Sequence, residues 1–218
     1  MSTKISMAVL LACASSMAHA QEFDVVGGQT SVLLDTDTLA SAASLTLSGV
    51  SSDVIAPGEL GDMSVAFGIN ARDASMLPTS FSYDAGLSNF AGSMEHTGSV
   101  FFNSDSVEVG NFTIGYDAMR VGGDRSGFFV QSTTGISAIL FDVAAPSFLS
   151  ADAGGLIIEA DLLVSSEFAG FLLDNQFATA DLTGADVGDA RVNAAAVPAP
   201  GALAIFGLGG LAASRRRR

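Results

Sequence analysis

Short stretches in which apolar and polar residues alternate run through most of the chain, and this period of two is typical of β-strands. The alternation is clear in Ser44–Ser48 and in Thr79–Tyr83, as expected of half-buried antiparallel strands. Turn residues such as Gly122-Gly123-Asp124 separate the stretches at short spacings. The pattern therefore predicts an all-β protein, an antiparallel β-sandwich with one or two short helices. The predicted strands are Ser31–Asp35, Ser44–Val50, Met63–Ile69, Ser80–Ala85, Phe90–His96, Ser99–Asn103, Val107–Tyr116, Gly127–Ser132, Ser137–Val143 and Leu156–Val164.

Two segments of the body carry a helical pattern instead. Thr38–Ala43 is long enough for one short turn, with Thr38 as its N-cap. Ser166 is expected to cap a longer helix from Glu167 to about Phe177, because a carboxylate in the first turn and aromatic residues on one face favour a helix there.

The N-terminus has the order of features of a secretory signal peptide. Lys4 precedes an apolar run from Met7 to Met17, and the small residues Ala18 and Ala20 stand three and one positions before a cleavage point. We therefore expect signal peptidase to remove residues 1–20, in preference to the alternative of a buried N-terminal helix. Removal also takes the only cysteine of the chain, so the mature protein has no disulfide.

The C-terminus combines a proline motif, an apolar stretch and a basic cluster. The motif is Val197-Pro198-Ala199-Pro200, and an uncharged stretch follows it up to Ala213. A helix over Pro200–Ser214 would be about 22 Å long, short of the ~30 Å hydrocarbon core, which makes it a marginal membrane anchor. The positive-inside rule keeps the basic end cytoplasmic and leaves the body outside the membrane. The basic cluster is Arg215, Arg216, Arg217 and Arg218.

This order of features resembles the PEP-CTERM sorting signal of exported bacterial proteins. One departure is Ala199, which stands where the motif usually has a glutamate. The resemblance implies recognition by a membrane-embedded exosortase, transient membrane insertion and removal of the tail near Pro198 to Pro200. It also implies delivery to the cell envelope, the cell surface or an extracellular polymer matrix. A permanent single-span anchor is the alternative, and a GlyGly-type signal is disfavoured because Gly209-Gly210 lies inside the apolar stretch.

These features divide the chain into a signal peptide (1–20), a β-sandwich body (21–194) and a sorting tail (195–218), with a linker over Ala194–Ala199. All 23 acidic residues lie in the body, against four arginines and no lysine. Such a surface excludes a nucleic-acid partner, because binding to phosphate needs basic patches. A content of 49% hydrophobic residues also argues against disorder.

Residues that could carry catalysis are few. His96 is the only histidine of the body, and it is expected on the surface at the end of the hairpin formed by Phe90–His96 and Ser99–Asn103. The chain has no G-x-S-x-G motif, so a catalytic triad built on His96 is disfavoured. Zinc is disfavoured because its sites use several His or Cys ligands. Glu95 and Glu108, on neighbouring predicted strands, form the best carboxylate pair for glycan hydrolysis. We nevertheless expect a protein that is not an enzyme.

Calcium is the more plausible ligand, because hard cations prefer several oxygen donors. The alternative is a solvated acidic face, since neither acidic cluster has the EF-hand or RTX spacing. The first hypothesis is therefore an exported, non-catalytic surface or matrix protein with a structural or adhesive role. The alternatives are a glycan-binding or glycan-active module that uses surface carboxylates and calcium to engage extracellular polysaccharide, and a permanently anchored protein. The candidate calcium ligands are Asp35, Asp37, Asp181, Asp186 and Asp189.

Overall fold

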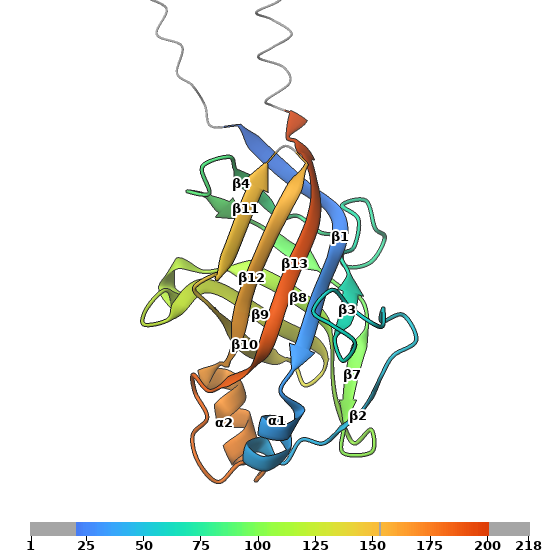
Figure 1. Ribbon diagram of the computed structural model, residues 1–218, viewed down its shortest axis with the longest axis vertical. Coiled ribbons are helices and arrows are strands. Elements are labelled where there is room, and N and C mark those ends of the chain that lie inside the picture. The colour runs from blue at the N-terminus through green and yellow to red at the C-terminus, as the bar shows by residue number, and fades with distance from the viewer. Residues whose placement is uncertain (1–20, 153, 201–218) are drawn as a thin grey trace, which may run out of the picture.

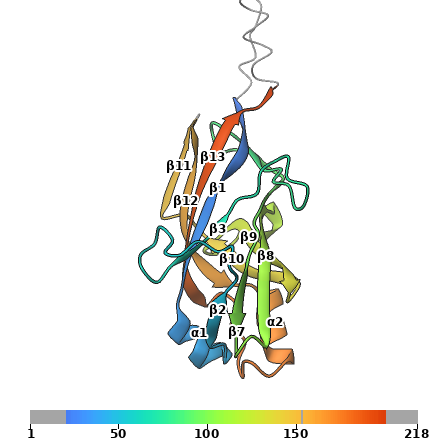
Figure 2. The same cartoon turned by 90° about the vertical axis from the view of Figure 1, so that its right-hand side faces the viewer.

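The computed structural model describes residues 21–152 and 154–200. Its strands form one antiparallel sheet of 13 strands in the order β2-β7-β8-β9-β10-β12-β13-β1-β4-β5, with β11 beside β12, β3 beside β1 and β6 beside β8. The sheet curls until its two halves lie face to face (Figures 1 and 2). The predicted antiparallel all-β sandwich is confirmed, with its two layers formed by one curled sheet. The predicted C-terminal apolar helix lies outside the described residues.

The element bounds follow the chain. The helices are α1 (Thr36–Ala43), the short 3-10 helix η1 (Ala118–Arg120) and α2 (Ser166–Asp174). The strands are β1 (Glu22–Leu34), β2 (Leu47–Val50), β3 (Val65–Gly68), β4 (Ser82–Asp84), β5 (Phe90–Ala91), β6 (Ser93–Glu95), β7 (Ser99–Phe102), β8 (Val107–Tyr116), β9 (Arg125–Gly135), β10 (Ala138–Ala144), β11 (Phe148–Asp152), β12 (Gly155–Val164) and β13 (Asp186–Pro198).

Alternation along the strands builds the core between the two layers. In β12, Leu156 and Leu162 are fully or almost fully buried, whereas Asp161 on the same strand is exposed. In Figure 1, β11, β12, β13 and β1 lie side by side in one layer, and β8, β9 and β10 cross behind them. Each layer therefore turns one apolar face inward and one polar face to solvent, as antiparallel sheets commonly do.

The two helices lie together at one end of the sandwich (Figure 1). α1 buries Leu39 and Ala43, and α2 buries Phe168, Ala169 and Leu172. Their N-caps lie closer to the N-terminus than the sequence suggested. The Asp35 carboxylate caps α1 in place of Thr38, and the Ser165 hydroxyl caps α2 in place of Ser166. Each cap accepts the backbone N–H three residues on, which satisfies a donor that the helix itself leaves unpaired.

The strand predictions succeeded in part, and β1 (Glu22–Leu34) is longer than the predicted Ser31–Asp35. The predicted strand Val107–Tyr116 is β8 as observed. The expected hairpin is wrong, because Glu95 pairs with Thr113 and Ser99 pairs with Gly110, so both segments add to β8. The expected linker over Ala194–Ala199 is also wrong, because β13 continues through Pro198.

Both ends of the described chain lie at the end of the molecule opposite the helices (Figure 1). β1 begins there and β13 finishes there, paired from Phe23↔Pro198 to Leu34↔Gly188. A bulge between Val25 and Gly27 interrupts this ladder, and Gly28 follows it with a φ of 119°. A Cβ at Gly28 would lie 2.2 Å from the Asn193 carbonyl oxygen, so the close approach of the two strands requires glycine. In the part of the chain that the structure describes, neither helix combines the length and apolar character needed to cross a membrane.

Candidate functional site

The proline motif predicted for sorting is built into the end of β13. Val197 and Pro198 are residues of the strand, opposite Asp24 and Phe23 of β1. Ala199 follows directly, is only 8% exposed and donates its backbone N–H to the Glu22 carbonyl at 2.9 Å. Residues 197–199 of the motif are therefore held against the first residues of β1, and Pro200 begins a helical turn.

The position of Pro198 fits this end of β13. Val25 donates its N–H to Phe81 on the β4 side of β1, and the Glu22 carbonyl accepts from Ala199 on the β13 side. The N–H and carbonyl groups of successive residues point to opposite sides of a strand. The N–H and carbonyl groups of Glu22 and Asp24 therefore point toward β13.

Val197 and Ala199 consequently direct their N–H groups at β1, and Pro198 directs its ring nitrogen away from it. On that far side β12 pairs no further than Ala195. The strand therefore tolerates Pro198, because its missing N–H group would have had no ladder partner.

The other residues predicted for processing lie outside the described residues: Ala18, Ala20 and the cluster Arg215, Arg216, Arg217 and Arg218. The predicted cleavage point after Ala20 nevertheless lies just before β1, whose residue Glu22 contacts Ala199. The fold thus brings the predicted start of the exported chain beside the proline motif.

Asp35 and Asp37, one pair of calcium candidates, lie at the start of α1. The Asp35 carboxylate accepts the Thr38 backbone N–H at 2.9 Å and the Thr38 hydroxyl at 2.6 Å. These hydrogen bonds hold the pKa of Asp35 below its ordinary value. Asp37 occupies the first turn of the helix, where a negative charge favours the helix dipole. Both acids therefore stabilise the start of α1.

The second calcium cluster is spread over a loop and the beginning of β13. Asp181 accepts the backbone N–H and hydroxyl of Thr183 in a tight turn, which lowers its pKa. Asp186 and Asp189 lie on β13, and partial burial together with the charges of Asp161 and Asp186 raises the pKa of Asp189. Among the described residues, no group of three or more His, Cys, Asp or Glu side chains is arranged to hold a metal ion.

His96 lies in the core, and its predicted surface position is wrong. Its side chain is 1% exposed, with Nε2 2.8 Å from the Thr30 hydroxyl and Nδ1 3.0 Å from the Phe112 carbonyl. Burial lowers the pKa of His96 to about 4, so the ring is neutral at pH 7. In that state Nδ1–H donates to the carbonyl, and Nε2 accepts from the hydroxyl. The ring borders an apolar cavity of about 80 Å³ and is a satisfied core residue.

The carboxylate pair considered for hydrolysis is not assembled. Glu95 lies opposite Thr113 and accepts hydrogen bonds from the Thr113 and Ser93 hydroxyls, both at 2.6 Å. Glu108 lies opposite Phe101, nearer the start of β8, and accepts the Ser99 hydroxyl at 2.7 Å. The two side chains therefore have separate partners and do not face each other across a strand pair.

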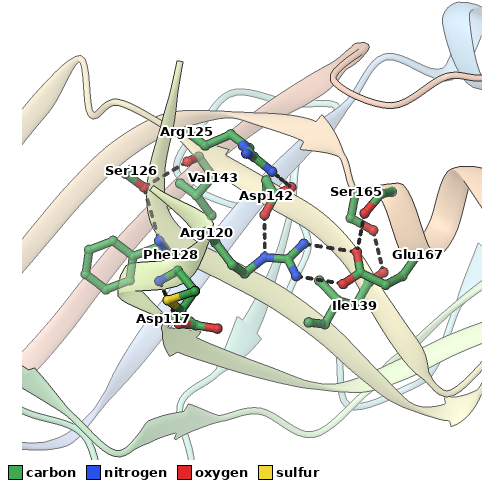
Figure 3. Close-up of polar contacts among 12 residues, drawn as sticks. Asp117, Arg120, Arg125, Ser126, Phe128, Ile139, Asp142, Val143, Ser165 and Glu167 are labelled. Carbon is green, nitrogen blue, oxygen red and sulfur yellow. Dashed lines mark hydrogen bonds and ion pairs between the residues drawn. The ribbon is translucent and has the colours of Figure 1, made fainter. Parts of the chain in front are cut away.

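An ion-pair network ties η1 to α2 across β10 (Figure 3). Arg120 places Nε 2.6 Å from the Asp142 carboxylate and binds both Glu167 oxygens, at 2.7 and 3.0 Å. Arg125 lies 3.6 Å from the second Asp142 oxygen. The hydrogen bonds from Arg120 lower the pKa of Glu167 to about 2. Asp142 is 1% exposed, and sequence reasoning missed it because its partners are distant along the chain.

The remaining arginines of the body are also paired. Arg72 lies 3.2 Å from Asp24, and Arg191 contacts Glu59 at 3.0 Å and also Glu159. No arginine between residues 21 and 194 is therefore left without a carboxylate partner in the described structure. The acids outnumber these four arginines, which leaves the body with a net negative charge.

A polar groove of about 560 Å³ lies on the outer face of β1, β13, β12 and β11. Glu59, from the loop between β2 and β3, is one of its lining residues. It accepts hydrogen bonds from Gln29 at 2.8 Å and from Asn193 at 2.9 Å. Six of the eleven lining residues are glycine, alanine or serine. The lining residues are Gly28, Gln29, Glu59, Ser150, Asp152, Gly154, Gly155, Ile157, Asn193, Ala194 and Ala195.

Comparison with protein families identifies the end of the chain. Residues 196–218 match the PEP-CTERM protein-sorting motif. The chain ends in a PEP-CTERM sorting signal. A comparison with curated proteins gives no match. Among solved structures, the C-terminal domain of HtaA from Corynebacterium glutamicum is similar at 18% identity and a TM-score of 0.49, over 80% of this chain and 99% of that domain.

The PEP-CTERM signal marks an exported protein that an exosortase processes and directs to the cell envelope. Its first residues, 196–198, belong to β13, and Ala199 is still hydrogen-bonded to β1. The signal therefore starts inside the folded body, with no spacer between body and motif.

Proposed function

We propose that the chain is an exported, non-catalytic protein of the cell surface or extracellular matrix with a structural or adhesive role. The observation that carries the proposal is the PEP-CTERM signal at residues 196–218, which continues directly from β13. The separate partners of Glu95 and Glu108 and the burial of His96 support a body without catalysis. Signal peptidase is the proposed enzyme at the other end, cutting between Ala20 and Gln21.

The test compares the protein made in a host with an exosortase and in the same host without it. We expect the processed chain to begin at Gln21 and to lack the residues from about Gly201 onward only when the exosortase is present. Replacement of the four terminal arginines by alanine is the matched control and should leave the tail in place. Intact mass of the envelope and secreted fractions is the measurement. A tail retained in the host with the exosortase would contradict the proposal and favour a permanent anchor.

A second candidate function is binding of neutral polysaccharide, and the polar groove favours it. Amide and carboxylate groups of Gln29, Asn193 and Asp152 can hydrogen-bond to hydroxyl groups, and Ile157 offers an apolar contact for sugar C–H groups. Phe148, 48% exposed, lies on β11 two residues before Ser150 and so on the same side of the strand. The negative surface disfavours anionic polymers.

A glycan array with the purified processed protein tests this second function. Asn193→Ala should weaken binding of any neutral glycan about tenfold, because one direct hydrogen bond in a desolvated site is lost. Gln131→Ala, an amide on β9 that does not line the groove, is the control. Equal binding by both variants, or the absence of any glycan ligand, would remove this candidate and leave the sorting proposal untouched.

A further inference from the structure

The strand that carries the sorting motif is already paired when the body is folded. Asp24 lies opposite Val197, and the Glu22 carbonyl accepts the Ala199 N–H at 2.9 Å. We call this pairing of Glu22–Asp24 with Val197–Ala199 the clasp. It forms where β13 has left β12, so β1 is the neighbour that holds the motif.

Pro198 makes the open edge of the motif a poor place for an enzyme to bind. Enzymes that hold an extended chain through its backbone need N–H groups and carbonyl groups to pair with. Pro198 has no N–H, and its ring nitrogen points to the open edge of β13. The N–H groups that the motif can offer belong to Val197 and Ala199, and in the folded body both face β1.

We propose that the clasp is a gate for sorting, so that the motif is processed only after Val197–Ala199 separates from Glu22–Asp24. This inference rests on the proposed processing of the tail near Pro198 to Pro200. The opening is local, because it involves the last residues of a strand and leaves the helical end intact. When opening and closing are fast compared with cleavage, the rate of processing follows the population of the open form.

A reversible covalent lock tests the gate. Asp24 and Val197 form a directly opposed, hydrogen-bonded pair, for which a Cα–Cα distance of about 5.5 Å is typical and suits a disulfide. The only native cysteine is Cys13, in the predicted signal peptide, so no other thiol of the mature chain competes. The double variant Asp24→Cys/Val197→Cys is made in cells without the exosortase as a precursor that begins at Gln21 and keeps its tail, and it is then oxidised and checked by intact mass and thiol titration. It is then mixed with membranes that contain the enzyme.

The oxidised double variant should lose its tail at least about tenfold more slowly than the wild type, and reductant should restore the rate. The reduced form of the same molecule is the control for folding, and the two single cysteine variants are the controls for side-chain changes in the motif. Equal rates for the oxidised and reduced forms would overturn the gate. A wild-type precursor that is not processed at all would instead contradict the proposed function.

A second variant moves the equilibrium the other way. Asp24→Pro removes the Asp24 N–H that faces β13 and should speed processing about fivefold by raising the open population. Asp24→Asn keeps the backbone and changes only the side chain that pairs with Arg72, so its rate should match the wild type. An Asp24→Pro rate equal to or below that of Asp24→Asn would count against the gate.

Discussion

The two ends of the sandwich are held in different ways. At the helical end, α1 and α2 bury apolar side chains such as Leu39 and Leu172, and α2 is tied through Glu167 to Arg120 (Figures 1 and 3). At the other end, the sorting motif is held to β1 by backbone pairing, and Val197 is 44% exposed. We therefore expect the end that carries the sorting signal to open at little cost to the helical end.

The largest effect is expected from removing the buried carboxylate of the helical end. Asp142→Ala leaves Arg120 and Arg125 without their shared partner and should lower the free energy of unfolding by about 4 kcal/mol. Glu167→Gln, which changes the other partner of Arg120, is the control. Its side chain is 41% exposed, so the cost should stay below about 1 kcal/mol. Urea denaturation measures both, and equal costs would show that burial does not distinguish the two pairs.

Apolar packing of α2 should give the next largest effect. Leu172 is fully buried, and Leu172→Ala should destabilise the protein by about 3 kcal/mol through lost packing and the cavity left behind. The adjacent Leu173 is 37% exposed, so Leu173→Ala should cost under about 1 kcal/mol. Thermal and urea unfolding of the pair of variants measures the difference. Similar values would mean that α2 contributes little to the stability of this end.

Two strands show how far the pattern of hydrophobicity predicts the fold: β8, which was predicted, and β13, which was not. β8 alternates large apolar residues such as Val107 and Val109 with polar or small ones, and its bounds were predicted. In β13, Ala194 points inward and Ala195 outward, so the pattern of hydrophobicity carries no period and the strand looked like a linker. The side chains of β13 do alternate between the two faces of the sheet, but at Ala194 and Ala195 the residues on both faces are alanine, so the sequence does not show the alternation there.

Contacts between residues far apart in the chain could not be predicted from the sequence. His96 stands between Glu95 and Thr97, two residues before Gly98, and was predicted to lie on the surface at the end of a hairpin. Its partner Thr30 lies 66 positions away, and that contact depends on how the sheet curls. The groove residues Gln29, Glu59 and Asn193 likewise come together only in the folded sheet. The proline motif was found from sequence, but its pairing with β1 was not.

Protonation of the buried His96 should have an intermediate effect on the free energy of unfolding. This effect depends on pH and does not involve either end of the sandwich. Its pKa is about 4 in the folded protein, below the ordinary value of 6.5, so the unfolded chain binds the proton more readily. Stability is therefore fully present above about pH 6.5 and falls by about 2 kcal/mol on acidification to about pH 5. Thr30 and the Phe112 carbonyl face the ring, and the charge of Glu95 opposes the shift.

The check is urea denaturation of the wild type and His96→Gln between about pH 7 and pH 5. The variant should lose the slope of stability against pH in this range, whatever its stability at neutral pH. Glu167 does not interfere, because its folded pKa is about 2 and its contribution is lost at lower pH. An unchanged slope in His96→Gln would assign the acid sensitivity to other groups.

The smallest effect is expected in the hydrogen exchange of backbone amides. Exchange compares the helical end directly with the sorting end, where Val197–Ala199 pairs with Glu22–Asp24. Val197 and Val192 lie on the same strand, but Val192 is 6% exposed and pairs on both sides, with Thr30 of β1 and Ile158 of β12. If the sorting end opens locally, the Val197 amide should exchange at least about tenfold faster than that of Val192, a difference of 1.4 kcal/mol in opening free energy. Leu172→Ala should speed exchange at Val192 more than at Val197, because only the former depends on global unfolding. Hydrogen exchange followed by NMR measures both, and equal protection at the two valines would mean that the sorting end opens only when the whole fold does.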